Sequence, residues 1–370
     1  MEKRIHVVGP PHVPVREAYS TCAFVTLAKY FCRMLVYEGW NVTYYGTEGD
    51  EIQCQEFVQV QPFEQMKLFW PENVANRYTH SYKDKRGGIE HFDHRLKREL
   101  RKRIEGREIV ASIFNSGARF LNQMPEAITV DPFVGYSNPW AKYNVFPSRA
   151  HRGYVYGKHE ASMTKYWRDA MIPHFVDVGE YFYVSSKREY ALFMARLPNF
   201  NKGLYVAMET CRKKDVPLKV AGLFFNERME KQALYHISQY TNVEYIGPVS
   251  GVQKKSVLSE AMCFFAPTFY HEPFGLVAVE ALASGTPVIS TDWGGLAEIV
   301  KHGVTGYRCR YERDFDYAIE EIRSLSPRDC RKRAEKSYSI LGAGKEYDRY
   351  LRRVIEVEKG SGNLWYNGEN

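Results

Sequence analysis

The sequence predicts an α/β protein with two Rossmann-like domains, each built on a doubly wound parallel sheet, that face a central cleft. At 370 residues the chain is long for one hydrophobic core and sufficient for two domains of about 150 to 180 residues. Short apolar runs alternate with amphipathic helical segments from the first residues onward. Charged residues at 26% and hydrophobic residues at 44% are ordinary for a soluble globular protein.

The first half of the chain begins with a βαβ unit. An apolar run at residues 4–9 predicts a strand, and residues 21–38 show the apolar spacing of a helix that ends at a glycine. Residues 41–46 predict the second strand of this unit. Two further strands are predicted at residues 109–114 and 128–136.

Two loops of this half carry polar side chains that could face a ligand. The segment PPHVPVREAYS follows the first strand and contains His12 and Arg16. Loops at the carboxyl ends of the strands line the ligand crevice of a doubly wound sheet, so both side chains are candidates for ligand contacts. Asp131, which precedes Pro132, is another candidate, although a turn at a strand end is the favoured interpretation.

Residues 60–107 are highly charged, and the piece HFDHRLKRELRKRIEGRE predicts a basic amphipathic helix. A solvated helix face is the favoured interpretation. A surface that touches membrane lipid or nucleic-acid phosphate is the alternative. The net charge of +7 is compatible with phosphate-bearing ligands, anionic membranes and nucleic acid, and does not choose among them.

The seven cysteines are scattered, odd in number and without a CxxC pair. This usage predicts reduced thiols in a cytoplasmic protein rather than a disulfide or zinc framework. No segment approaches the roughly 18 consecutive apolar residues of a membrane span, and the N-terminus lacks the apolar core of a signal peptide. We therefore expect a soluble protein with at most peripheral membrane contact.

The most informative stretch is residues 267–300, which predict a loop, a helix at about 274–284, and a strand at 288–290. Two carboxylates, Glu272 and Glu280, lie eight positions apart in the loop and the helix. A buried carboxylate is costly unless it is hydrogen-bonded. Glu280 therefore lies either at the wet edge of the helix or in a site that holds a hydroxylated ligand.

Glu272 precedes the predicted helix N-terminus, where free N–H groups of Phe274, Gly275 and Leu276 favour an anion. Glu280 lies roughly 7 Å further along the axis, at about 1.5 Å per residue. This arrangement suits an elongated ligand in which a phosphate separates two hydroxylated groups. A nucleotide sugar has that layout.

The segment HEPFGLVAVEALASGTPVI resembles the E-x7-E signature of family-4 retaining glycosyltransferases, which have the GT-B fold. The resemblance implies that Glu272 contacts the transferred sugar and that Glu280 binds the ribose of the donor. The following DWGGLAEIVKHGVTGYRCR also resembles that family.

A second resemblance lies upstream. The segment ARLPNFNKG is similar to the family's G-R-L-x-x-x-K-G element, with Ala195 in place of the first glycine. Arg196 and Lys202 of this element are expected to clamp the donor diphosphate, since two cations there can converge on it. In relatives the backbone near Val249 meets the nucleobase, which implies a donor-binding role for Val249 and Gly247.

The first half follows the family less closely. Relatives usually have a glycine-rich loop after the first strand that meets the diphosphate, where this chain offers Gly9 followed by two prolines. Many relatives also have a histidine near the reacting sugar, and no histidine follows either predicted strand here. That role stays unassigned, with His12, Asp131 and Arg16 as candidates on the acceptor side.

The segment MIPHFVDVGEYFY resembles the family's interdomain linker. We therefore predict an acceptor-binding domain at residues 1–175 and a nucleotide-sugar-binding domain at 176–343. Residues 344–370 are predicted to form a helix that crosses back to the first domain, followed by a tail.

Together these features predict a retaining glycosyltransferase that moves a sugar from a UDP- or GDP-linked donor to a hydroxyl acceptor. No cofactor or metal is expected, because Arg196, Lys202 and the helix N-terminus can stabilise the leaving diphosphate. A glycan is the favoured acceptor; a lipid-linked sugar, a protein or a hydroxylated base in DNA stay open. The alternatives are another enzyme class on the same fold, such as a phosphorylase or an epimerase, and a non-enzymatic nucleotide-sugar-binding protein.

Overall fold

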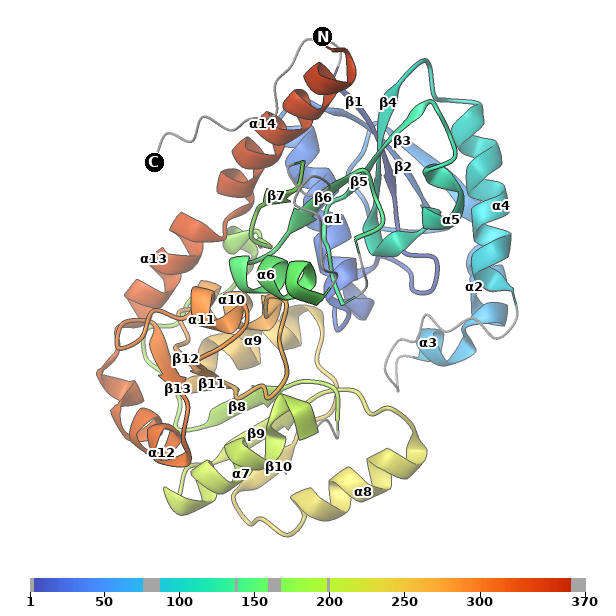
Figure 1. The fold of residues 1–370 in the computed structure, drawn as a ribbon. Coiled ribbons are helices and arrows are strands. Elements are labelled where there is room, and N and C mark those ends of the chain that lie inside the picture. The colour runs from blue at the N-terminus through green and yellow to red at the C-terminus, as the bar shows by residue number, and fades with distance from the viewer. Residues whose placement is uncertain (1–2, 76–86, 137–138, 159–167, 198–199, 361–370) are drawn as a thin grey trace.

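The computed structural model describes residues 3–75, 87–136, 139–158, 168–197 and 200–360. The described chain forms two parallel sheets, one in each of two domains (Figure 1). The strand order is β3-β2-β1-β4-β5-β6-β7 in the first sheet and β10-β9-β8-β11-β12-β13 in the second. The predicted architecture of two Rossmann-like domains is confirmed. Part of the charged region at 60–107 and the predicted tail lie outside the described residues.

The strands of the first sheet lie between residues 4 and 171, and those of the second between residues 191 and 309. The first sheet comprises β1 (Arg4–Val8), β2 (Asn41–Thr47), β3 (Glu56–Gln61), β4 (Glu108–Ser112), β5 (Ala127–Asp131), β6 (Tyr143–Phe146) and β7 (Ala170–Met171). The second comprises β8 (Ala191–Met194), β9 (Leu218–Ala221), β10 (Val243–Tyr245), β11 (Cys263–Ala266), β12 (Val288–Thr291) and β13 (Gly306–Cys309).

Helices cover the faces of both sheets (Figure 1). In the first domain they are α1 (Ala23–Tyr37), α2 (Phe63–Phe69), α3 (Pro71–Ala75), α4 (Gly88–Arg101), α5 (Ala118–Leu121) and α6 (Arg149–Lys158). The later helices are α7 (Leu204–Lys213), α8 (Glu227–Ile237), α9 (Gly251–Glu260), α10 (Leu276–Ala283), α11 (Leu296–Ile299), α12 (Glu312–Glu321), α13 (Pro327–Ser337) and α14 (Ile340–Glu358). Among the described residues, no helix is both long and apolar enough to cross a membrane.

The chain crosses between the domains twice, and the two crossings are hydrogen-bonded to each other. The Val176 N–H donates to the Tyr338 carbonyl at 2.9 Å, and the Ile340 N–H donates to the Val176 carbonyl at 2.9 Å. After the second crossing, α14 runs along the first domain (Figure 1) and packs on α1, where the Phe31 and Tyr347 rings lie 5.2 Å apart. The two crossings therefore meet at one point of the domain junction.

Three differences from the sequence prediction affect the site. The strand predicted at 128–136 ends at Asp131, because Pro132 has no N–H for the ladder and the chain turns away. The helix predicted from residue 274 begins at Leu276, after Gly275 adopts a left-handed φ of 104°. Strand β6 and helix α6, which follow the loop after β5, were not predicted from the sequence.

We predict that Tyr347→Phe lowers the free energy of unfolding by about 1 to 3 kcal/mol. The Tyr347 hydroxyl donates at 2.7 Å to the buried carbonyl of Pro132, and its loss leaves that carbonyl without this donor while the ring packing is kept. Urea unfolding measures the effect, and Tyr317→Phe at a half-exposed ring is the matched control. Equal stability of both variants would contradict the assigned role of this bond.

Candidate active site

The loop between β11 and α10 lies at the domain junction and is fixed by a glycine pair. The Gly295 N–H donates to the Glu272 carbonyl at 2.8 Å. A Cβ on Gly295 would lie 2.5 Å from the Phe274 Cα, and a Cβ on Gly294 would lie 2.9 Å from the Glu272 carbonyl oxygen. Both positions therefore need glycine because the two backbones touch.

Glu272 is 8% exposed and accepts hydrogen bonds from three side chains. Its Oε2 accepts from the Tyr270 hydroxyl at 2.5 Å and forms an ion pair with Lys202. Its Oε1 accepts from the hydroxyl of Tyr136, a first-domain residue, at 3.1 Å. The structure thus brings together two predicted residues, Glu272 and Lys202, and adds two tyrosines that the sequence analysis missed.

Arg196 follows β8 and is exposed. Its guanidinium makes no hydrogen bond or ion pair with the residues that the structure describes. It nevertheless lies near the first domain: burial raises the pKa of the Cys22 thiol, at the start of α1, and the charge of Arg196 opposes that rise. Arg196 is therefore a cation at the domain junction that is available to a ligand.

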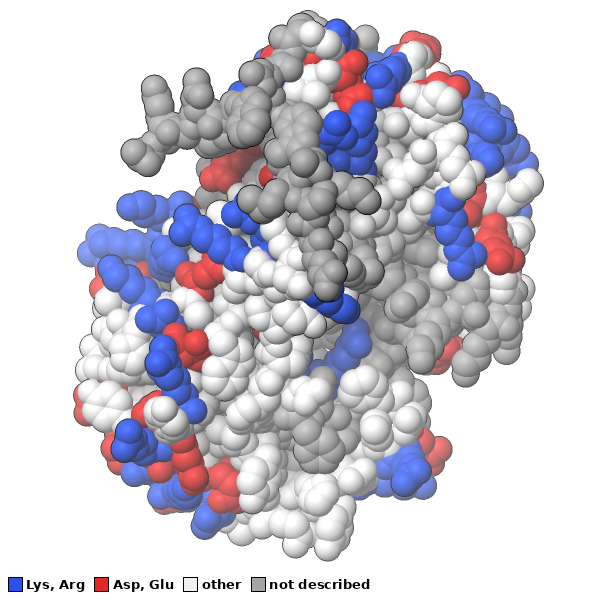
Figure 2. All heavy atoms as spheres, viewed as in Figure 1, with Lys and Arg blue, Asp and Glu red and all other residues white. Residues whose placement is uncertain are grey.

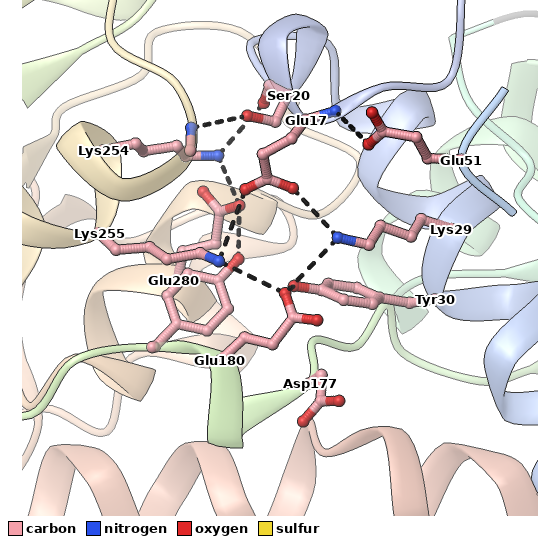
Figure 3. Close-up of polar contacts among 12 residues, drawn as sticks. Glu17, Ser20, Lys29, Tyr30, Glu51, Asp177, Glu180, Lys254, Lys255 and Glu280 are labelled. Atoms are coloured by element: carbon pink, nitrogen blue, oxygen red, sulfur yellow. Dashed lines mark hydrogen bonds and ion pairs between the residues drawn. The ribbon is translucent and has the colours of Figure 1, made fainter. Parts of the chain in front are cut away.

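Glu280 lies on α10 and is 1% exposed, so the wet-edge interpretation is wrong. Its Oε1 accepts from Lys254 Nζ on α9 at 2.6 Å and from the Tyr181 hydroxyl at 3.0 Å. Its Oε2 is buried and has no hydrogen-bond partner among the described residues. Figure 3 shows this carboxylate beside side chains of both domains, and the cavity there is lined by Glu17 and Ser20 of the first domain.

A second layer of charges surrounds this cavity (Figure 3). Lys29 of α1 lies 3.1 Å from Glu17 and 3.9 Å from Glu180, and Lys255 of α9 lies 3.5 and 3.4 Å from the same carboxylates. Burial tends to raise the pKa of Glu180, but Arg33 and Lys29 outweigh it and the pKa lies below its usual value. These ion pairs between lysines and glutamates thus connect α1, the segment after the first crossing and α9.

The turn predicted to meet the nucleobase follows β10 and leads into α9. Gly247 has a left-handed φ of 80°, and its carbonyl accepts from the Gly222 N–H at 3.2 Å. Val249 is buried at 2% exposure. The Gly251 N–H then donates to the Ser20 hydroxyl at 3.3 Å, so the end of this turn faces the same junction as Glu280.

The N–H groups of three residues were predicted to favour an anion at the start of α10. Leu276 is the first residue of this helix, so its N–H has no partner within the helix. Phe274 and Gly275 precede the helix. The Phe274 ring is 3% exposed and packs on His174 at 4.9 Å. The N-terminus of this helix therefore lies two residues later than predicted.

The first-domain candidates are engaged inside that domain. The Gly9 N–H donates to Tyr45 at 2.9 Å, and a Cβ there would lie 2.0 Å from the Tyr44 hydroxyl. The His12 ring is 2% exposed and lies 4.5 Å from the Phe114 ring.

Arg16 donates to the carbonyls of Glu48 and Gly49 at 2.7 and 2.9 Å. Asp131 accepts from the Phe133 N–H at 3.1 Å, as a strand-end turn requires, and burial raises the pKa of Asp131 to about 7. All these contacts lie within the first domain.

His151 on α6 is a residue that the sequence analysis did not single out. Its Nε2 lies 2.8 Å from the Gly135 carbonyl, which can only accept, so Nε2 carries the hydrogen. Burial lowers the pKa of His151. The N-terminus of α6 is capped by Glu298 of the second domain, which accepts from the Ala150 N–H at 2.8 Å. Helix α6 therefore connects the loop after β5 to the second domain.

In the described part of the chain, no group of three or more His, Cys, Asp and Glu side chains could hold a metal ion. On the face drawn in Figure 2, a hollow separates the two halves of the molecule, and Lys or Arg side chains are visible inside it.

We predict that Lys254→Met destabilises the protein by about 3 to 5 kcal/mol, because Glu280 would keep a buried charge without its counterion. The double variant Lys254→Met/Glu280→Leu should recover most of this loss, since both charges are then gone. Urea unfolding of the wild type, both single variants and the double variant gives the coupling energy. Strictly additive losses would show that the two charges do not depend on each other.

Residues 183–338 match the family described as Glycosyl transferases group 1. An uncharacterised glycosyltransferase of Methanocaldococcus jannaschii is 33% identical over 127 residues, which is 33% of this chain and 32% of that protein. A glycogen synthase of Mycobacterium tuberculosis is 37% identical over 115 residues, which is 30% of this chain and 27% of that protein. The chain thus spans about a third or less of the length of these curated relatives.

Among solved structures, AviGT4, a glycosyltransferase involved in avilamycin A biosynthesis, has a TM-score of 0.64 and 19% identity, covering 95% of this chain and 98% of that one. This likeness extends over both domains, whereas the family match covers the second. The matched segment contains Glu272, Glu280, Arg196 and Lys202. Residues 183–338 are therefore a Glycosyl transferases group 1 domain, within a chain that has the two-domain GT-B architecture.

Proposed function

We propose that the protein is a retaining glycosyltransferase that moves a sugar from a UDP- or GDP-linked donor to a hydroxyl acceptor. The observation that carries the proposal is the pair of carboxylates at the domain junction. Glu272 lies where both domains meet, and Glu280 directs an unpartnered buried oxygen beside the cavity. A nucleotide sugar would place its sugar at Glu272 and its ribose at Glu280.

The leaving diphosphate gains negative charge as the glycosidic bond breaks, and three features favour that charge. They are the exposed cation of Arg196, the ammonium of Lys202 and the free N–H groups at the start of α10. This set can act without a metal. The nucleobase then lies against the turn that contains Gly247 and Val249.

Glu272 is proposed to orient the sugar rather than to attack it. The ion pair with Lys202 and the hydrogen bond from Tyr270 partly neutralise the charge of this carboxylate, which makes it a weaker nucleophile. The same carboxylate can offset the positive charge of an oxocarbenium-like transition state. The departing phosphate is then the base that accepts the proton of the acceptor hydroxyl, with retention of configuration.

A glycan is the favoured acceptor, in keeping with the partial likeness to glycogen synthase. The basic helix gives less support to a nucleic acid or a membrane surface, because its cations are partly paired. Lys102 and Arg103 both bind Glu99 at 2.8 Å and hold the pKa of that carboxyl down to about 2. A cytoplasmic location is part of the proposal, in keeping with seven free cysteines.

We expect one nucleotide series to raise the melting temperature in a panel of UDP, GDP, ADP and their common sugars, measured with EDTA present. Ligand at about 100 times its Kd adds roughly 2.7 kcal/mol, which is enough to detect. Glu280→Gln should weaken this binding, since it replaces the oxygen proposed for the ribose with an amide.

Four outcomes of this panel and of a turnover assay are informative. A shift that needs added divalent metal would contradict the metal-independent clamp. Equal binding by Glu280→Gln would remove the ribose assignment. No shift with any nucleotide would contradict the proposed donor, and binding without turnover on any acceptor would favour a nucleotide-sugar-binding protein.

We predict that Arg196→Ala/Lys202→Ala lowers turnover at least about 100-fold, since the charge of the leaving diphosphate loses both cations. Because Lys202 is the counterion of the largely buried Glu272, its loss also lowers the stability, so turnover is measured well below the unfolding transition of each variant. The matched control is Arg328→Ala/Lys332→Ala, which removes two exposed cations from α13. Rates are measured with saturating donor, and an active double variant with a normal rate would place the clamp elsewhere.

A further inference from the structure

Tyr136 is a first-domain residue whose side chain meets the second domain at Glu272. It lies in the loop after β5, in which the Val134 N–H donates to the Val145 carbonyl at 3.1 Å and His151 Nε2 donates to the Gly135 carbonyl at 2.8 Å. The Tyr136 residue nevertheless remains 68% exposed. The two residues before Tyr136 are therefore hydrogen-bonded to β6 and α6, and the exposed ring of Tyr136 places its hydroxyl at the site.

The hydrogen bonds around the Tyr136 hydroxyl do not use all the lone pairs of the oxygen atoms there. Three oxygen–oxygen contacts join Tyr136, Tyr270 and Glu272, at 2.7, 3.1 and 2.5 Å. The two phenols have only one proton each. In the shortest contact the Tyr270 hydroxyl donates its hydrogen bond to Glu272 Oε2. The Tyr136 hydroxyl can therefore donate either to the Tyr270 oxygen or to Glu272 Oε1.

Two acceptor oxygens thus lie side by side with lone pairs to spare. Glu272 Oε1 is held only by the longest of the three contacts, and the Tyr136 oxygen accepts no proton in this arrangement. Their separation of 3.1 Å is close to the spacing of two neighbouring hydroxyl groups on a sugar ring, which are donors as well as acceptors. The pair is therefore complementary to a vicinal diol.

We propose that Tyr136 is a specificity-determining residue that, with Glu272, binds a vicinal diol of the transferred sugar. This inference rests on the proposed function. One sugar hydroxyl donates to Glu272 Oε1 and its neighbour donates to the Tyr136 oxygen. Tyr136 of the first domain thereby contacts the sugar directly, and donors that lack one of these hydroxyls bind more weakly.

The test compares the Kd values of UDP and UDP-glucose, and of GDP and GDP-mannose, by calorimetry for wild type and Tyr136→Phe. The phenylalanine keeps the ring and removes the hydroxyl, so sugar-free diphosphates should bind both proteins equally. The nucleotide sugar should bind the variant about 3- to 10-fold more weakly, the range for one hydrogen bond. Tyr37→Phe, at a ring of 59% exposure on α1, is the matched control.

A second measurement separates a direct contact from a structural effect. Donors with fluorine in place of the sugar 2-, 3- or 4-hydroxyl cannot donate from that position. One of them should weaken binding to the wild type and have a smaller effect on Tyr136→Phe, since the contact is already lost. Equal sugar contributions in both proteins, or purely additive losses for every fluorinated donor, would overturn the inference while nucleotide binding still supported the proposed function.

Discussion

The charge of Glu280 is the constraint on which the junction depends. A carboxylate at 1% exposure loses its hydration, and this loss is tolerable only where other groups replace the water. Lys254 comes from α9 and Tyr181 from the segment after the first crossing, so α9, α10 and that segment must keep a fixed relation. The second oxygen remains without a partner in the described structure, which is the strongest indication of a ligand beside it.

Glu272 is the same residue type in a different setting. The partners of Glu280 lie after the first crossing between the domains, whereas Glu272 receives one of its hydrogen bonds from Tyr136 across the junction. Its environment therefore depends on how closely the domains approach each other. Under the proposed function, Glu280 would hold the nucleotide part of the donor and Glu272 the sugar that is transferred.

The sequence predicted what depends on local pattern. The apolar runs placed β1, β2, β4 and β5 of the first sheet and β12 of the second, and the E-x7-E spacing placed Glu272 in a loop and Glu280 on a helix. It could not predict the partners of these carboxylates. Tyr136 lies 136 positions from Glu272 and Tyr181 lies 99 positions from Glu280, and no periodicity links segments that far apart. Lys254 was missed because its helix resembles an ordinary surface helix, and the true end of β5 depended on one proline.

The paired crossings have a consequence for the integrity of the molecule. Val176 is hydrogen-bonded to both sides of the second crossing, and α14 beyond that crossing is packed on α1. The two domains are therefore joined by two segments of the chain rather than by a single linker. A single backbone cleavage at the first crossing would therefore leave the two fragments associated through the packing of α14 on α1.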